Sequence, residues 1–412
     1  MDDSKHPAVH PLFLLLCVMV AMTAIGHCQY TWTLFVPSIK RSLHVNFAQV
    51  QLGFSIFITL QTCSVLALGV LVTPKLYKAV MCAGSLLIGG AYYGLSVSSQ
   101  LGHVYVCCAA LGMGVGCVYN GCVSLAVRLF PRNRGLASGM AASGYGGGTL
   151  LTVSLLRSRI ESDGYQLTFR WLGVYVSLIS LAASSLLPHE LWMEKKMEEP
   201  PPHLYRMDVP LKKAVRKDTF WLLYLLLVLI TFVGLVVTAQ LRPLAEAFDI
   251  PIKTFVYALQ ERADRMLNFI SRPLWGSVSD VIGRLEALGL AFSMQAVVLV
   301  IWSAHLGDES YFVICSALST FSWGEVYSIF PAIAADLYGV QHVSATFGAL
   351  YTGKAVASIL AGPVVSVVSD LLSWYLIIEV MAFLSLLDAL LAVFVLKPRV
   401  DRETRPPAIT LA

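Results

Sequence analysis

The sequence predicts an integral membrane protein built only from α-helices, with twelve transmembrane helices in two bundles of six. Of its 412 residues, 57% are hydrophobic and 13% are charged, whereas a soluble domain carries about 25% charged residues. Apolar runs of about 20 residues, the length of a helix that crosses a bilayer, recur along the chain. A membrane barrel would instead show ~10-residue segments of alternating polarity. Helices must therefore provide the spans.

Twelve apolar segments divide the chain. They cover about 11–36, 48–73, 79–98, 103–127, 135–157, 169–188, 219–246, 254–279, 285–305, 311–335, 344–368 and 372–396. The stretch between the sixth and the seventh segment, 189–218, is rich in proline and in charges of both signs, which is typical of a linker. We therefore predict an N-terminal bundle at 1–188, a linker at 189–218, and a C-terminal bundle with a short tail at 219–412.

The distribution of basic residues predicts the orientation of the chain in the membrane. Most of the 29 Lys and Arg lie in the two termini, in the linker and in the loops on the same side as these. Because basic residues concentrate in cytoplasmic segments, both termini and the linker are expected in the cytoplasm. The first apolar segment continues to about Phe35 without a small-x-small cleavage pattern, so it is predicted to be a span and not a removed signal peptide.

Several function classes find no support in the sequence. The nine cysteines fall mostly inside apolar runs and show no Cys-x-x-Cys or zinc-ligand spacing. No Ser/His/Asp constellation is recognisable, and no strand precedes the glycine-rich segments, so neither an enzyme nor a dinucleotide site is indicated. The basic residues flank the spans and form no nucleic-acid surface. We expect no cofactor, no metal, no nucleic-acid partner, and a monomer in the lipid bilayer.

The two halves repeat weakly in sequence. Residues 69–77 match 276–284 at an offset of 207, Tyr119 matches Tyr327 at 208, and Tyr145 matches Lys354 at 209. Three matches at nearly one offset indicate two parallel repeats. Transporters with such repeats place the substrate site between them, near the bilayer midplane.

Three charged residues lie deep in predicted spans. Counted from the inner ends of their helices, Arg272 is roughly 12 Å deep, and Glu325 and Lys354 are roughly 18 Å deep, at about 1.5 Å per residue. A lysine stem cannot reach either surface from there, and a central charge costs at least ~2.5–3.5 kcal/mol. One interpretation is that Arg272 and Lys354 bind an anion.

The other interpretation is purely structural, with permanent ion pairs between Lys354 and Glu325 and between Arg272 and Asp264. Asp264 lies on the same helical stripe as Arg272, eight residues before it. Apolar replacements of buried ion pairs are often no less stable, which favours the anion-binding interpretation. Arg262 points away from this stripe, and no role is assigned to it.

Polar aromatic residues and one amide occur in spans one, four, five, ten and eleven. We expect these side chains to wall a small cavity, where their hydroxyl, indole and amide groups can donate to a carboxylate. The set comprises Gln29, Tyr30, Trp32, Tyr119, Tyr145, Trp323, Tyr327 and Tyr351.

The loop between spans eight and nine carries a recognisable motif. It reads "GSVSDVIGR" and contains Gly276, Asp280, Gly283 and Arg284. With twelve spans in two halves, this loop resembles the gating motif of the major facilitator superfamily. The matching loop of the first half, "GVLVTPKLYK", lacks the acidic residue, so a gating role is expected mainly of the second loop.

Within that superfamily the chain resembles the oxalate/formate antiporter family, which is monocarboxylate-transporter-like, from end to end. The stretches "GMGVGCVYNG", "NFISRPLWGSVSDVIGR" and "FGALYTGKAVAS" carry the resemblance. It implies that Arg272 and Lys354 bind substrate carboxylates and that the aromatic set surrounds them. Tyr351 stands where the oxalate exchanger has tryptophan, and Glu325 where it has a small residue. An acid at the depth of Lys354 would favour a monoanion.

The sequence therefore predicts a secondary active transporter that exchanges small carboxylates, such as oxalate and formate, by alternating access. The resemblance implies a cell membrane location, in bacteria the inner membrane. One alternative is a proton-coupled monocarboxylate symporter that uses Glu325. A second alternative is a carboxylate sensor that binds but does not transport.

Overall fold

The structure is a computed structural model of the 412-residue chain. It describes residues 10–150, 152–188, 190, 209–250, 255–361, 365 and 371–404, and it describes no side chains at 239, 242, 255–262 and 404. Within the described part every regular element is a helix. Most of the predicted linker and the side chain of Arg262 lie outside the described residues, so the domain boundaries remain predictions.

The helices coincide with the predicted spans. The first half contains α1 (Pro11–Tyr30), α2 (Trp32–Leu43), α3 (Phe47–Leu71), η1 (Pro74–Leu76), α4 (Tyr77–Ser96), α5 (Leu101–Leu129), α6 (Arg134–Gly147), α7 (Val153–Ser162) and α8 (Gly164–Leu186). The second half contains α9 (Leu211–Ala214), α10 (Asp218–Ala247), α11 (Phe255–Ile282), α12 (Arg284–Ala304), α13 (Glu309–Trp323), α14 (Val326–Tyr338), α15 (Val343–Tyr351), α16 (Gly353–Ile359), α18 (Trp374–Leu390), η4 (Leu391–Leu396) and α19 (Lys397–Thr404). The predicted all-helical fold is confirmed.

In the described part of the chain, eight of the twelve spans are long and apolar enough to cross a bilayer by length and composition alone. The fifth, tenth and eleventh spans are each divided into two helices, and the eighth, α11, is strongly polar along one side. Irregular backbone and polar side chains at membrane depth are tolerated only inside the protein. These four spans are therefore expected to face the protein interior.

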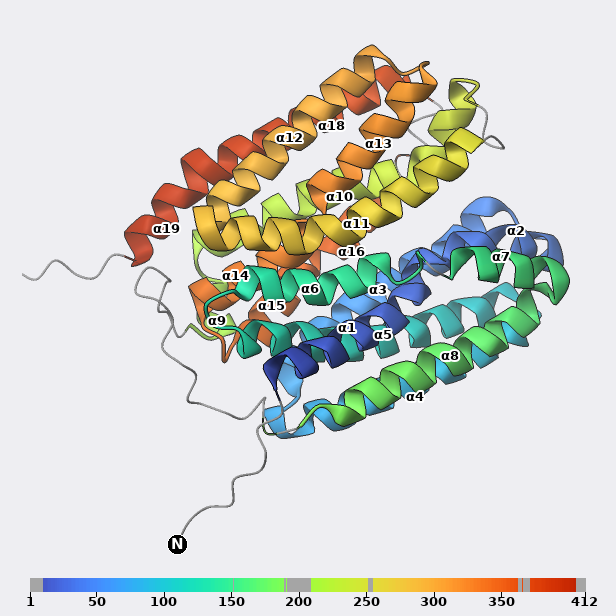
Figure 1. The fold of residues 1–412 in the computed structure, drawn as a ribbon, viewed down its shortest axis with the longest axis horizontal. Coiled ribbons are helices and arrows are strands. Elements are labelled where there is room, and N and C mark those ends of the chain that lie inside the picture. The colour runs from blue at the N-terminus through green and yellow to red at the C-terminus, as the bar shows by residue number, and fades with distance from the viewer. Residues whose placement is uncertain are drawn as a thin grey trace, which may run out of the picture.

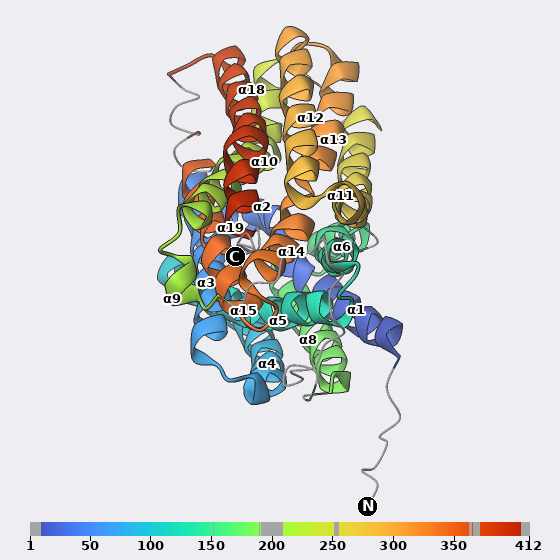
Figure 2. The same cartoon turned by 90° about the vertical axis from the view of Figure 1, so that its left-hand side faces the viewer.

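The helices form two bundles side by side, with α1 to α8 in one and α10 to α19 in the other (Figure 1). At the boundary, α6 packs against α11 and α3 packs against α15, which is visible when the molecule is viewed from its end (Figure 2). The two contacts have equivalent positions in the two repeats. The boundary between the halves is therefore built mainly from the second, fifth, eighth and eleventh spans, and α14 of the tenth span also packs on α6.

Close backbone contacts at this boundary repeat the offset found in the sequence. A Cβ atom added to Gly276 would overlap the carbonyl of Gly135, and one added to Gly69 would overlap the carbonyl of Ser344. Gly276 and Gly69 are 207 residues apart, and Ser344 and Gly135 are 209 apart. Small residues let helices approach closely in membranes. The repeat detected in the sequence thus corresponds to a pseudo-twofold relation between the two halves.

Candidate functional site

Two cations lie buried between the halves. Arg272 of α11 is 0% exposed and Lys354 of α16 is 1% exposed. Both lie over the ring of Tyr327, with Arg272 Cζ 4.6 Å and Lys354 Nζ 5.5 Å from its centroid. Two neighbouring positive charges in a dry interior repel each other, and this arrangement is costly unless an anion or strong acceptors compensate it.

Arg272 binds three neutral oxygen atoms. Its Nε donates to Asn268 Oδ1 at 3.0 Å, one turn earlier on α11, and one terminal nitrogen donates to the hydroxyl of Tyr30 at 3.0 Å. The other terminal nitrogen donates to the carbonyl oxygen of Ala142 on α6. The guanidinium of the second half is therefore held by two groups of the first half.

Lys354 likewise reaches across the boundary. Its Nζ donates to Gln29 Oε1 of α1 at 2.9 Å and to the hydroxyl of Tyr351 at 3.0 Å. Gln29 Oε1 also accepts a hydrogen bond from Tyr145 at 2.8 Å, and Tyr145 accepts one from Gln61 Nε2 at 2.9 Å. The amide oxygen of Gln29 thus occupies the place where a negatively charged oxygen would bind Lys354 most strongly.

Aromatic rings surround the two cations. Tyr119 stacks on Tyr351 with centroids 5.1 Å apart and meets Tyr145 edge to face at 5.3 Å. Tyr327 meets Tyr351 at 6.4 Å and Trp323 at 5.4 Å. These five rings, with Tyr30, bring together six members of the aromatic set predicted from the sequence.

Two of these aromatic residues keep free donor groups. Among the residues the structure describes, neither the indole nitrogen of Trp323 nor the hydroxyl of Tyr327 has a hydrogen-bond partner, although both are buried. A buried polar group without a partner costs about 1–3 kcal/mol. Unpartnered donors close to two buried cations indicate a binding site for a hydrogen-bond acceptor that comes from outside the chain.

Helix breaks coincide with this cluster. The backbone leaves regular helix at Thr31, next to Tyr30, and at Thr352, between Tyr351 and Lys354. The tenth span breaks at Gly324 and Glu325, between Trp323 and Tyr327. Each break therefore lies next to residues of the cluster, as expected where irregular backbone lines an interior site.

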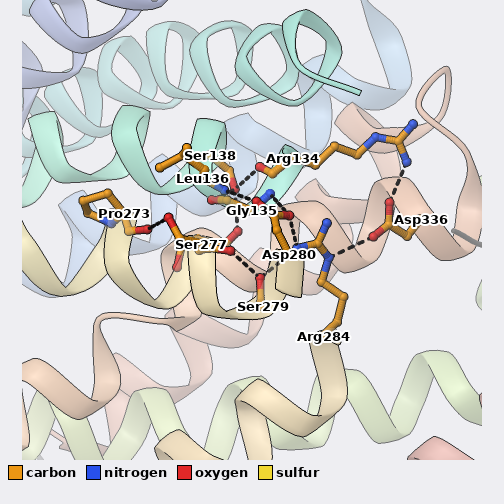
Figure 3. A network of polar contacts seen from close by, with 12 residues as sticks. Arg134, Gly135, Leu136, Ser138, Pro273, Ser277, Ser279, Asp280, Arg284 and Asp336 are labelled. Carbon is orange, nitrogen blue, oxygen red and sulfur yellow. Dashed lines mark hydrogen bonds and ion pairs between the residues drawn. The ribbon is translucent and has the colours of Figure 1, made fainter. Parts of the chain in front are cut away.

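A second polar network joins the two halves at the end of the molecule where α9 and α19 lie (Figures 1 and 3). Asp280 of α11 accepts hydrogen bonds from the backbone N–H groups of Gly135 at 3.0 Å and Leu136 at 2.8 Å. These N–H groups belong to the first turn of α6, where they lack helical partners and the helix dipole favours negative charge.

Ion pairs extend this network (Figure 3). Arg284 bonds to Asp280 and, at 2.9 Å, to Asp336 of α14, and Asp336 also binds Arg134 of α6. Gly283, just before Arg284, has φ +108°, which favours glycine over any side chain. The four residues of the predicted gating motif thus lie together at the closed end of the boundary between the halves. We refer to Asp280, Arg284, Asp336 and Arg134 as the ionic gate.

A family model described as "Major Facilitator Superfamily" matches residues 12–260 and 266–411 of the chain. The chain belongs to the Major Facilitator Superfamily. This is the superfamily that its twelve spans and its gating loop resemble.

The chain is similar to the oxalate:formate antiporter of Oxalobacter formigenes, with 28% identity over 95% of this chain and 93% of that protein. Among solved structures it is similar to the proton:xylose symporter XylE, with a TM-score of 0.71 and 12% identity, covering 97% of this chain and 100% of that one. It is also similar to FucP, a transporter of this superfamily, with a TM-score of 0.67 and 16% identity, covering 92% of this chain and 98% of that one. These structures share the fold. The resemblances seen in the sequence are confirmed.

The structure differs from the ion-pair interpretation of the sequence. Lys354 bonds to Gln29 and Tyr351 and not to Glu325, and Arg272 bonds to neutral oxygens and not to Asp264. Glu325 is fully buried, and neither of its oxygens has a hydrogen-bond partner among the described residues. Compensation of Lys354 by Glu325 is therefore absent from this conformation. Similar depth did not bring the two side chains together, because they leave their helices in different directions.

Trp32, which was predicted to line the cavity with the other aromatic residues, instead packs its ring near Gly53 of α3. Conversely, sequence reasoning missed Arg134, Asp336 and Gln61. Asp336 could have been found from the repeat, because it stands 208 residues after Arg128, at the same end of the equivalent helix. A charged residue at the same helix end in both repeats indicates that this end takes part in the contact between the halves.

Breaking the ionic gate should open the end of the molecule that it closes. Asp336→Asn leaves Arg134 and Arg284 without their shared carboxylate, and removing one partner of a buried ion pair costs about 3–5 kcal/mol. The population of the conformation with this end open should rise more than ~100-fold relative to the closed one. Spin labels at the exposed positions Arg132 and Gln341, one on each half, should report a longer distance.

The matched control is Glu286→Gln, which removes a half-exposed pair with Lys397 inside the second half. It should leave the distance between the labels unchanged. An Asp336→Asn distance equal to that of the wild type would show that the ionic gate does not hold the halves together.

Proposed function

We propose that this protein is a secondary transporter, not an enzyme, and that it exchanges small carboxylate anions by alternating access. The observation that carries this proposal is the buried pair Arg272 and Lys354, which among the described residues has no carboxylate partner and bonds only to neutral oxygens. Similarity to an oxalate:formate antiporter supports the choice of anion.

The geometry suits a carboxylate. Arginine presents a planar fork of N–H donors that matches a carboxylate, while lysine acts as a point charge that can bind a second oxygen. Tyr327 lies next to both cations and Trp323 packs on Tyr327; among the described residues neither the hydroxyl nor the indole N–H has a partner. A bound anion would displace neutral acceptors such as the oxygens of Tyr30 and Gln29, and hydrogen bonds between ionised groups are roughly twice as strong as neutral ones.

The same contacts favour exchange over net transport of the anion alone. In a transporter the two halves rock about the midplane site, so the contacts across the boundary must change in every cycle. Without an anion, Arg272 and Lys354 lose Ala142, Tyr30 and Gln29 when the halves separate. An anion neutralises the cations through this change. The empty carrier should therefore reorient more slowly than the loaded one.

The predicted orientation places the ionic gate on the cytoplasmic side, with the termini and the linker. In this conformation the protein is then closed toward the cytoplasm, and the cations are out of contact with solvent. Opening the gate would expose the same site to the cytoplasm. We expect the protein to work as a monomer in a cell membrane, because each chain contains both halves of the site.

Binding of isosteric ligands with different charge tests the anion site. Oxalate, oxamate and oxamide have nearly the same shape and carry two, one and no negative charges. Calorimetric titration of the purified protein should show affinity that falls along this series, by about tenfold or more per charge removed, since a charged hydrogen bond contributes ~1.5–3 kcal/mol. Equal affinity for oxalate and oxamide would contradict the proposal. Tighter binding of oxamate than of oxalate would keep the anion site but make it specific for monoanions.

A further inference from the structure

Two buried carboxyl groups in the described part of the second half belong neither to the anion site nor to the ionic gate. Glu325 lies at the break between α13 and α14, and Asp388 lies on α18; both side chains are 0% exposed. None of their four carboxyl oxygens has a hydrogen-bond partner among the described residues. Asp388 is close enough to interact electrostatically with Glu325. Sequence analysis singled out Glu325 but not Asp388.

Within the described part of the chain, the surroundings of this pair supply no counter-charge. Between Asp218 and Arg242, α10 has no charged residue, and α12 has none after Glu286. The charged group of α11 nearest to this turn is Arg272, whose Cγ would meet a Cβ atom on Gly324. Its guanidinium, however, is directed to Asn268, Ala142 and Tyr30.

On α13, which leads into this turn, no charged residue follows Glu309. Lys354, the cation of α16, bonds to Gln29 and Tyr351. Tyr327 of α14 is the other titratable group that interacts with Glu325. Glu379, the other acid of α18, is on the exposed side of its helix.

An ionised carboxylate in such a place is out of contact with bulk solvent and has no cation beside it among the described residues. Burial of an unpaired charge is so costly that the group becomes neutral instead. Two nearby carboxylates disfavour ionisation further, because like charges repel. In this conformation the pair must therefore hold protons.

We propose that Glu325 and Asp388 form a proton-binding site, separate from the anion site. Glu325 lies between Trp323 and Tyr327, so a change in its charge acts directly on the turn that presents these two donors to the anion. Protons would be taken up from water on one side of the membrane and released on the other when the turn becomes hydrated. A proton bound here would accompany an anion bound at Arg272 and Lys354 and offset its charge. This coupling between proton and anion rests on the proposed function.

Infrared difference spectroscopy of the full-length protein tests the proton site independently of transport. At neutral pH the wild type should show the carbonyl stretch of protonated, buried carboxylic acids, and Glu325→Gln and Asp388→Asn should each remove part of this band. Glu379→Gln, an exposed acid on the same helix as Asp388, should leave it unchanged. A wild-type spectrum without the band, or a band that both variants leave intact, would overturn the proposal.

Transport in liposomes tests the coupling. An inward proton gradient should accelerate uptake of labelled formate into wild-type liposomes that contain unlabelled formate, and the acceleration should be lost in Glu325→Gln. If a sodium gradient instead removes the infrared band and accelerates uptake, the pair is a cation site and the proton proposal is wrong. If the wild type bound no carboxylate, the proposed function would be refuted. The infrared band would still show whether Glu325 and Asp388 hold protons.

Discussion

Lys354→Gln abolishes anion exchange and leaves the fold at least as stable as that of the wild type. Glutamine can still donate toward Gln29 and Tyr351, which Lys354 contacts, but it carries no charge. Loss of a charged hydrogen bond worth up to ~3 kcal/mol should reduce exchange by about 100-fold or more. The melting temperature should stay or rise, because the variant no longer buries a cation. Counterflow in liposomes and thermal unfolding measure the two effects.

This combination of results separates an anion ligand from a structural residue. A structural lysine would lower the melting temperature when replaced. Lys40→Gln, at an exposed position of α2, is the matched control and should change neither exchange nor stability. Exchange at the wild-type rate in Lys354→Gln would exclude Lys354 as a substrate ligand.

Gln29→Glu should block the site from within. The substitution puts a carboxylate oxygen in place of the amide oxygen that now lies 2.9 Å from Lys354 Nζ. Tyr145 already donates to the same oxygen at 2.8 Å, so the new carboxylate would be well held. A substrate would then compete with an internal anion, and its dissociation constant should rise by about 100-fold or more, equivalent to ~3 kcal/mol.

Gln29→Met serves as the control for this substitution. It keeps the length of the side chain but removes the acceptor, so it should bind oxalate as well as the wild type or better. Both variants are compared by calorimetric titration. If Gln29→Glu binds oxalate like the wild type, Lys354 does not contact the anion.

Much of the fold and the main charges of the site follow from the sequence. Span positions follow from apolar runs, because the bilayer fixes the length of a helix that crosses it. Arg272 and Lys354 stand out because lipid makes buried charge costly. Tyr145 and Lys354 occupy equivalent positions in the two repeats. In the structure both side chains donate a hydrogen bond to the amide oxygen of Gln29.

Side-chain direction was not predictable in the same way. Counting residues gives the depth of a group along its helix but not how one helix is rotated relative to another. Glu325 and Lys354 share a depth, yet Glu325 lies within electrostatic range of Asp388 while Lys354 reaches across to Gln29. Asp388 itself, eight residues before the end of the last predicted span, had no partner in the sequence that would mark it.

The helix breaks and the ionic gate depend on how the halves dock. Thr352 and Gly324 lie in segments that are apolar enough to remain helical, and only the interior site explains their breaks. Arg134 and Asp336 are 202 residues apart, so their pairing becomes visible only when α6 meets α14. The loop of the first half that lacks the acidic residue contacts the second half through a hydrogen bond between Tyr77 and Ser344. At the position equivalent to Tyr77, the second half has the charged residue Arg284.

The most direct test of carboxylate exchange is counterflow of labelled oxalate by the wild-type protein in liposomes loaded with unlabelled oxalate. We expect rapid accumulation of label without a proton gradient, far above protein-free liposomes, and slow loss of oxalate when no anion is outside. Binding of oxalate without any accumulation of label would contradict transport and indicate a carboxylate sensor.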